Sequence, residues 1–172
     1  MPSAKINTTE DFAIEFKNYI SKYALNNKEL KSCAEMIQYP WGVFKFKKKK
    51  KLKNELVFLN AFIGSITLRV CLNDNQVSQK NIDKIVNMYT NKLLAQELSG
   101  VTTKNYQKRL SKWSELFNDF EKPTKFSADM TKLSSSFYKF LTNNKCDPMT
   151  ESKLVLRFNG YMKRYIHYIS QM

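Results

Sequence analysis

The sequence predicts an all-α protein, a single compact bundle of six or seven helices over residues 1–172. Apolar residues recur at intervals of three and four along most of the chain, as they do in helices with one buried face. Glycine and proline are scarce, at four each, which disfavours turn-rich β folds. The length suits one domain, the hydrophobic content of 42% can supply its core, and no repeat or Gly/Ser linker divides the chain.

The first 44 residues are expected to hold two helices. Thr8 can cap the first one, and the aromatic and aliphatic residues between Phe12 and Tyr23 mark its buried face. Asn26 and Asn27 interrupt this pattern, and residues 28–36 then form a short second helix. The turn sequence YPWG, residues 39–42, ends it.

The lysine-rich stretch KFKKKKKLK, residues 45–53, is predicted to be an exposed basic loop. Adjacent like charges repel, and lysines are unfavourable at the positive start of a helix dipole. Trp41 and Phe44 are expected to anchor the base of this loop against the bundle, because burying a large apolar side chain is favourable.

A long helix is predicted directly after the lysine run. Apolar residues at helical spacing continue over several turns from Leu52 to Val70, and phenylalanines extend the apolar surface around most of the helix. A helix that is apolar on most sides is expected in the middle of the bundle. Polar residues interrupt the segment, so we expect a core helix and not a membrane span. Alternating apolar residues also leave a rival prediction, a minor two-stranded element near residues 43–72.

Two further helices follow a polar turn at residues 73–78. The first begins at Ser78, a candidate N-cap, and ends at Gly100. The second opens at Thr102 or Thr103, has Tyr106 and Trp113 on its apolar face, and ends before Pro123.

The C-terminal part is expected to form the last two helices. One covers residues 130–141. The other starts at Asp147 as N-cap with Pro148 at the first helical position, which is a specific start signal. It carries a tyrosine stripe at Tyr161, Tyr165 and Tyr168, which we expect mainly to dock the helix on the bundle.

The positive charge of the chain, +14 overall, is confined to two regions. Residues 45–53 carry seven basic and no acidic side chains, and residues 101–172 carry 13 basic against six acidic ones. The remaining segments, 1–44 and 54–100, are neutral. This distribution predicts two basic surfaces, or one surface built from both, that attract an anionic partner.

Few residues suggest catalysis or metal binding. The three cysteines are widely spaced without metal-ligand spacing, so we expect reduced thiols and an intracellular, cytoplasmic location. No apolar leader segment is visible at the N-terminus. His167 has no carboxylate one helical turn away, and no Gly-rich phosphate loop occurs. We therefore expect no catalytic residues, metal or small-molecule cofactor, although an enzyme site assembled across helices would leave no linear motif.

The lysine run is compatible with three uses. It can hold nucleic-acid phosphates without reading sequence, since base readout favours bidentate side chains. It can also bind an anionic membrane beside the aromatic residues, or remain a solvated segment. Residues 92–113 share the outline of a helix-turn-helix, but Gln96 stands where such motifs place a small residue, so a plain helical hairpin is preferred.

From these features we expect a small, non-enzymatic binding or adaptor protein that acts through a basic surface. An acidic protein or a nucleic acid is the expected partner, an anionic membrane is an alternative, and the oligomeric state is left open. The alternative is a nucleic-acid-binding protein with phosphate contacts from Lys45–Lys53 and the helix near Lys104–Lys112, and an enzyme with a site that the linear sequence does not show is the third hypothesis. The candidate contact residues are Lys45, Lys47, Lys48, Lys49, Lys50, Lys51, Lys53, Lys104, Lys108, Arg109 and Lys112.

Overall fold

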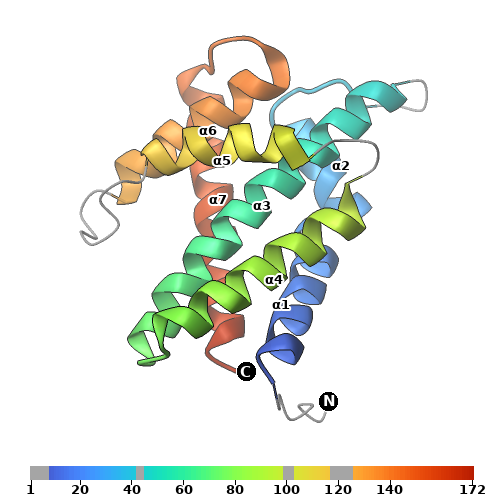
Figure 1. The fold of residues 1–172 in the computed structure, drawn as a ribbon. Helices are drawn as coiled ribbons and strands as arrows, with labels where there is room; N and C mark the ends of the chain where they lie inside the picture. Colours follow the sequence, from blue (N-terminus) through green and yellow to red (C-terminus); the bar gives the residue numbers. More distant parts are fainter. Residues whose placement is uncertain (1–7, 42–44, 99–102, 117–125) are drawn as a thin grey trace.

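The computed structural model describes residues 8–41, 45–98, 103–116 and 126–172. In these ranges the chain forms seven α-helices and no strand, so the predicted all-α bundle of six or seven helices is confirmed (Figure 1). The helices are α1 (Thr9–Ala24), α2 (Asn27–Met36), α3 (Phe46–Asp74), α4 (Gln79–Glu97), α5 (Thr103–Leu116), α6 (Phe126–Thr142) and α7 (Pro148–Ile169).

The longest helix, α3, is the core of the bundle. It packs against α4 on one side and α7 on another, and α5 and α6 cross it near its N-terminal half (Figure 1). Every residue from Asn54 to Gly64 is buried. Its length and composition would allow it to cross a membrane, but most of its apolar segment is buried by the other helices, as in a core helix.

One prediction for this part of the chain is wrong, because residues 46–53 are the first two turns of α3 and not a basic loop. The preferred helix from Leu52 to Val70 is confirmed, and the rival two-stranded element is not observed in the described residues. The physical reason for the helical start lies further along the chain. Burial of more than a dozen residues downstream outweighs the unfavourable charge at the helix start.

The starts of three helices follow local capping rules. The Thr8 hydroxyl accepts a hydrogen bond from the Asp11 amide at 3.1 Å, and Asn26 caps α2 in the same way. The Asp147 carboxylate accepts from the Thr150 amide at 2.9 Å, and these hydrogen bonds lower the pKa of Asp147. In contrast, Lys45 at the start of α3 makes no side-chain capping bond.

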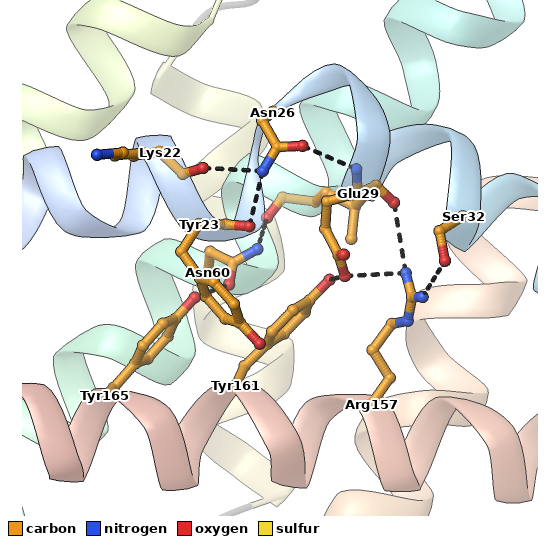
Figure 2. A network of polar contacts seen from close by, with 10 residues as sticks. Lys22, Tyr23, Asn26, Glu29, Ser32, Asn60, Arg157, Tyr161 and Tyr165 are labelled. Carbon is orange, nitrogen blue, oxygen red and sulfur yellow. Dashed lines mark hydrogen bonds and ion pairs between the residues drawn. The ribbon is translucent and has the colours of Figure 1, made fainter.

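A buried residue, Asn60, connects α3 with α4 and α7 at the centre of the bundle. Figure 2 shows its side chain beside Tyr165 of α7. The Tyr165 hydroxyl donates to Asn60 Oδ1, and the Tyr89 hydroxyl donates to the Asn60 carbonyl at 2.8 Å. The Asn60 Nδ2 group donates in turn to the Leu56 carbonyl. Burial raises the pKa of both tyrosines well above the usual value, so these hydroxyls remain neutral donors.

A second polar cluster fastens α2 to α7 (Figure 2). Arg157 forms an ion pair with Glu29 at 3.0 Å and donates to the Ser32 hydroxyl at 2.7 Å. The Tyr161 hydroxyl donates to the same Glu29 carboxylate at 2.7 Å. Much of the tyrosine stripe of the last helix therefore serves docking inside the bundle, since Tyr161 and Tyr165 are buried.

Candidate polyanion-binding surface

Because the lysine run is helical, its side chains point in different directions around α3. Residues 47, 50, 51, 54, 55 and 58 recur at intervals of three and four, and all of them line one hollow between α3 and α5. We call this hollow, of about 360 Å³, the α3–α5 pocket. Its lining residues are Lys47, Lys50, Lys51, Asn54, Glu55, Phe58, Asn105 and Arg109.

The other lysines of the run do not line this pocket. The Lys49 ammonium lies 4.7 Å from the centre of the Trp41 ring, and Lys53 forms an ion pair with Glu97 at 3.1 Å. Lys45 and Lys48 are exposed. Seven lysines of the run were predicted to contact a partner. Three of them line one pocket, and two others, Lys49 and Lys53, contact Trp41 and Glu97.

The two expected aromatic anchors have different outcomes. Trp41 is half-buried against the hydrophobic core and carries Lys49 on its ring. Phe44 lies outside the described residues. Next to them, Phe46 is one of the most exposed large apolar side chains of the described residues, at 70%.

Arg109 connects α5 to both of its neighbours. Its guanidinium donates two hydrogen bonds to the Glu55 carboxylate, at 2.8 and 3.0 Å, and lies 3.7 Å from the centre of the Phe140 ring. The side chains of Arg109 and Glu55 are only 19% and 5% exposed. Arg109 was predicted as a partner contact, but its charge is balanced by Glu55 inside the protein. It therefore holds α5 against α3 and α6 more than it attracts an anionic partner.

The remaining candidates on α5 lie beside the pocket. Lys108 and Lys112 are exposed one turn apart, while Tyr106 and Trp113 of the same helix are buried in the core. The side chain of Lys104 is outside the described part of the structure. Residues of both predicted basic regions therefore meet where α3 and α5 approach, through Lys47, Lys50, Lys51 and Arg109.

A second hollow, which the sequence did not indicate, lies further along α5, between α5, α6 and the turn before α7. We call it the α5–α6 groove, with a volume of about 930 Å³. Four of its lining residues are lysines and none is a carboxylate. The lining residues are Lys112, Lys132, Ser135, Ser136, Lys139, Phe140, Asn143, Asn144, Lys145 and Cys146.

The lysines of this groove come from three segments that are separate in the sequence. Lys112 belongs to α5, Lys132 and Lys139 belong to α6, and Lys145 lies in the turn before α7. A hydrogen bond of 3.2 Å from Trp113 Nε1 to the Ser136 hydroxyl fixes α5 against α6. Only Lys112 was singled out from the sequence, because the others are isolated along the chain and become neighbours through packing.

The carboxylates near the groove do not line it and are bonded to other groups. Asp147 caps α7, Glu151 accepts a hydrogen bond from Ser135, and Asp129 stands 4.0 Å from Lys132. Burial and the charges of Glu151 and Asp147 raise the pKa of the Cys146 thiol to about 11. Within the described residues, no group of three or more His, Cys, Asp or Glu side chains is placed to hold a metal ion.

One further pocket, of about 550 Å³, lies between α4 and α5 over α3. Apolar side chains such as Phe62, Ile66 and Leu110 line it together with neutral polar ones and with Arg69, which is paired with Asp83. The segment compared above with a helix-turn-helix, residues 92–113, covers the C-terminal end of α4 and most of α5, and the side chains of Tyr106 and Trp113 hold α5 on the core. The turn between these helices lies outside the described ranges.

Comparison with known proteins gives no guide to the function. No family model, no curated protein and no solved structure matches this chain. The functional interpretation therefore depends on the side chains of the α3–α5 pocket and the α5–α6 groove.

Proposed function

We propose that this protein is a small, non-enzymatic binding protein that holds an anionic partner on a basic surface. This basic surface consists of the α3–α5 pocket, the exposed side of α5 and the α5–α6 groove. The observation that carries the proposal is the α3–α5 pocket, where Lys47, Lys50 and Lys51 of the 45–53 run lie against α5. Helix α5 adds the exposed Lys108 and Lys112 of the second basic region, while the charge of Arg109 is balanced by Glu55. Two charged regions far apart in the sequence thus contribute to one surface potential.

The charges of this surface support binding more than structure. In the described residues no ion pair involves Lys47, Lys50, Lys51, Lys112, Lys139 or Lys145. Close lysines repel, and at the start of α3 they also oppose the helix dipole. An anionic partner would relieve both effects, which is a reason for such a surface to exist.

The polar groups inside the bundle contrast with this surface. Glu29, Arg157 and Asn60 are bonded to neighbouring side chains or backbone and serve packing (Figure 2). The single histidine, His167, is exposed and bonded to Gln171 at 3.0 Å. These features favour a binding protein over an enzyme as the proposal.

The salt dependence of polyanion binding tests this proposal. We expect the protein to be retained on a heparin matrix and to elute at a lower salt concentration after Lys47, Lys50 and Lys51 are replaced by glutamine. Glutamine removes the charge and keeps a good helix propensity, so the fold of α3 is retained. The salt concentration at elution is the measured quantity.

A matched control separates a local surface from bulk charge. Lys22, Lys80 and Lys84 are exposed, line neither hollow and can be replaced by glutamine with the same loss of charge. We expect this control to elute close to the wild type. Equal shifts for both variants, or no retention of the wild type, would contradict the proposal.

A further inference from the structure

We propose that the α5–α6 groove is a binding site for single-stranded nucleic acid, with its lysines on the phosphates and its amides and aromatic wall beside the bases. This inference rests on the proposed function, because it names the anionic partner of the same surface. It assigns that role to residues that the sequence did not single out, above all Lys132, Lys139 and Lys145.

The first argument is the shape of the site. A reader of duplex DNA usually inserts a protruding helix into the major groove. Here the lysines line a hollow of about 930 Å³, and the apolar face of α5 is turned into the core through Trp113. A hollow lined by cations accommodates a thin flexible strand, whose backbone it can follow.

The second argument is the chemistry between the lysines. The side-chain amides of Asn143 and Asn144 line the groove and have no hydrogen-bond partner within the described residues. An amide both donates and accepts, as the edges of nucleobases do, whereas aspartate and glutamate side chains only accept. The neutral part of the lining is therefore better matched to bases than to an acidic peptide.

The third argument is the aromatic wall. Phe140 lines the groove, where the Arg109 guanidinium covers one face of its ring at 3.7 Å and the Lys112 ammonium lies 5.3 Å from the ring centre. The part of the ring that remains open to the groove is the surface offered to a base. Bases stack on aromatic rings and on guanidinium planes, and such stacking does not depend on sequence. The ring is recessed and half-buried, so it is not placed to insert into a bilayer.

The test measures fluorescence anisotropy of a labelled oligothymidine of about 20 nucleotides, long enough for a typical single-strand site. In the groove variant, Lys112, Lys132, Lys139 and Lys145 are replaced by glutamine. In the control, Lys22, Lys80, Lys84 and Lys163 are replaced; all four are exposed and none lines the pocket or the groove. Both variants lose four charges, and circular dichroism checks that both stay folded.

We expect the groove variant to bind at least about tenfold more weakly than the wild type, and the control less than about threefold. The slope of log affinity against log salt should decrease in magnitude by about 2 to 3 in the groove variant, since each phosphate contact on a single strand contributes about 0.7. Equal losses in the two variants would overturn the assignment to the groove.

Competition experiments distinguish the partner classes. Single strands should compete at least as well as duplex of equal length, and polyglutamate and vesicles with anionic lipid should compete less well. Stronger competition by duplex, by polyglutamate or by vesicles would overturn the single-strand assignment and leave the proposed basic-surface function standing. If no polyanion binds, both the inference and the proposed function fail.

Discussion

Arg109 is the residue at which the α3–α5 pocket and the α5–α6 groove meet. Its two hydrogen bonds to Glu55 and its contact with the Phe140 ring fix α5 between α3 and α6. Replacing Arg109 with alanine leaves the Glu55 carboxylate buried without its counter-charge. We expect the free energy of unfolding to decrease by about 3 kcal/mol, because breaking a buried pair from one side is costly. Urea denaturation measures the change.

A double variant provides the control for this effect. Replacing Glu55 and Arg109 together with methionine removes both charges and retains much of the buried volume. Because buried ion pairs are often neutral relative to apolar substitutes, we expect most of the lost stability to return. A double variant as unstable as the single one would show that Arg109 acts through packing on Phe140 rather than through its ion pair.

The reactivity of the Cys146 thiol with an alkylating reagent reports its pKa in the groove. Burial and the nearby carboxylates raise the pKa of its thiol to about 11, so little thiolate is present at neutral pH. Alkylation by iodoacetamide should be slow near pH 8 and become about tenfold faster per pH unit until the pKa is approached. Mass spectrometry of the Cys146 peptide follows the reaction. A rate that levels off below pH 9 would contradict the raised pKa.

At the scale of the elements, the start of α3 is less stable than it could be. Lys45 offers no side-chain cap, and the first turn contains lysines and no acidic residue. Replacing Lys48 with glutamate places a negative charge at the positive end of the helix dipole. We expect the free energy of unfolding to increase by about 0.5–1 kcal/mol and polyanion binding to weaken. Lys163→Glu, away from any helix start, is the control and should give no such increase.

Alanine substitutions at two helical glycines should have opposite effects on the stability of the protein. A Cβ atom at Gly64 would stand 2.3 Å from the Tyr89 hydroxyl oxygen, inside the core, whereas one at Gly160 meets nothing within 4 Å. Gly160→Ala should stabilise the protein by about 0.5–1 kcal/mol, because alanine is the better helix former. Gly64→Ala should destabilise it by about 1–2 kcal/mol, since the displaced ring outweighs the same helix gain. Thermal unfolding of both variants checks the signs.

The helix starts show which elements the sequence can specify locally. Thr8 and Asp147 were predicted as caps and do accept the expected amide hydrogen bonds, because capping involves residues only three positions apart. The start of α3 was missed for the opposite reason. Its local signals are unfavourable, and the burial of residues such as Leu56 and Phe62 against other helices decides its conformation.

At the scale of the whole molecule, packing creates features that no stretch of sequence contains. The lysine run is visible in the sequence as a charge cluster. That three of its lysines share a pocket with Arg109 depends on how α3 packs against α5. The groove lysines at positions 132, 139 and 145 stand alone in the sequence, with uncharged neighbours on at least one side, so nothing marked them as a set. Their shared orientation depends on how α5, α6 and the turn before α7 pack.

The net charge of +14 has a consequence for the stability of the entire fold. Like charges on a compact protein repel, and salt screens this repulsion. We therefore expect the melting temperature to rise when sodium chloride increases from about 20 to about 200 mM. The groove variant, with four fewer positive charges, should show a smaller rise. A melting temperature that falls with salt would mean that surface ion pairs outweigh the repulsion.

The amide of Asn60 also decides which arrangement of the helices is allowed. Two apolar helix faces can slide past one another by one turn, about 5.4 Å, and still bury similar side chains. In this bundle such a slide of α7 would place the Tyr165 hydroxyl opposite Leu56 or Gly64 instead of Asn60, among side chains buried from solvent. The hydroxyl would then lack an acceptor, at a cost of about 1–3 kcal/mol. One polar side chain among apolar ones thus favours a single register of α7 on α3 and, because α6 packs on α7, the position of the α6 lysines as well.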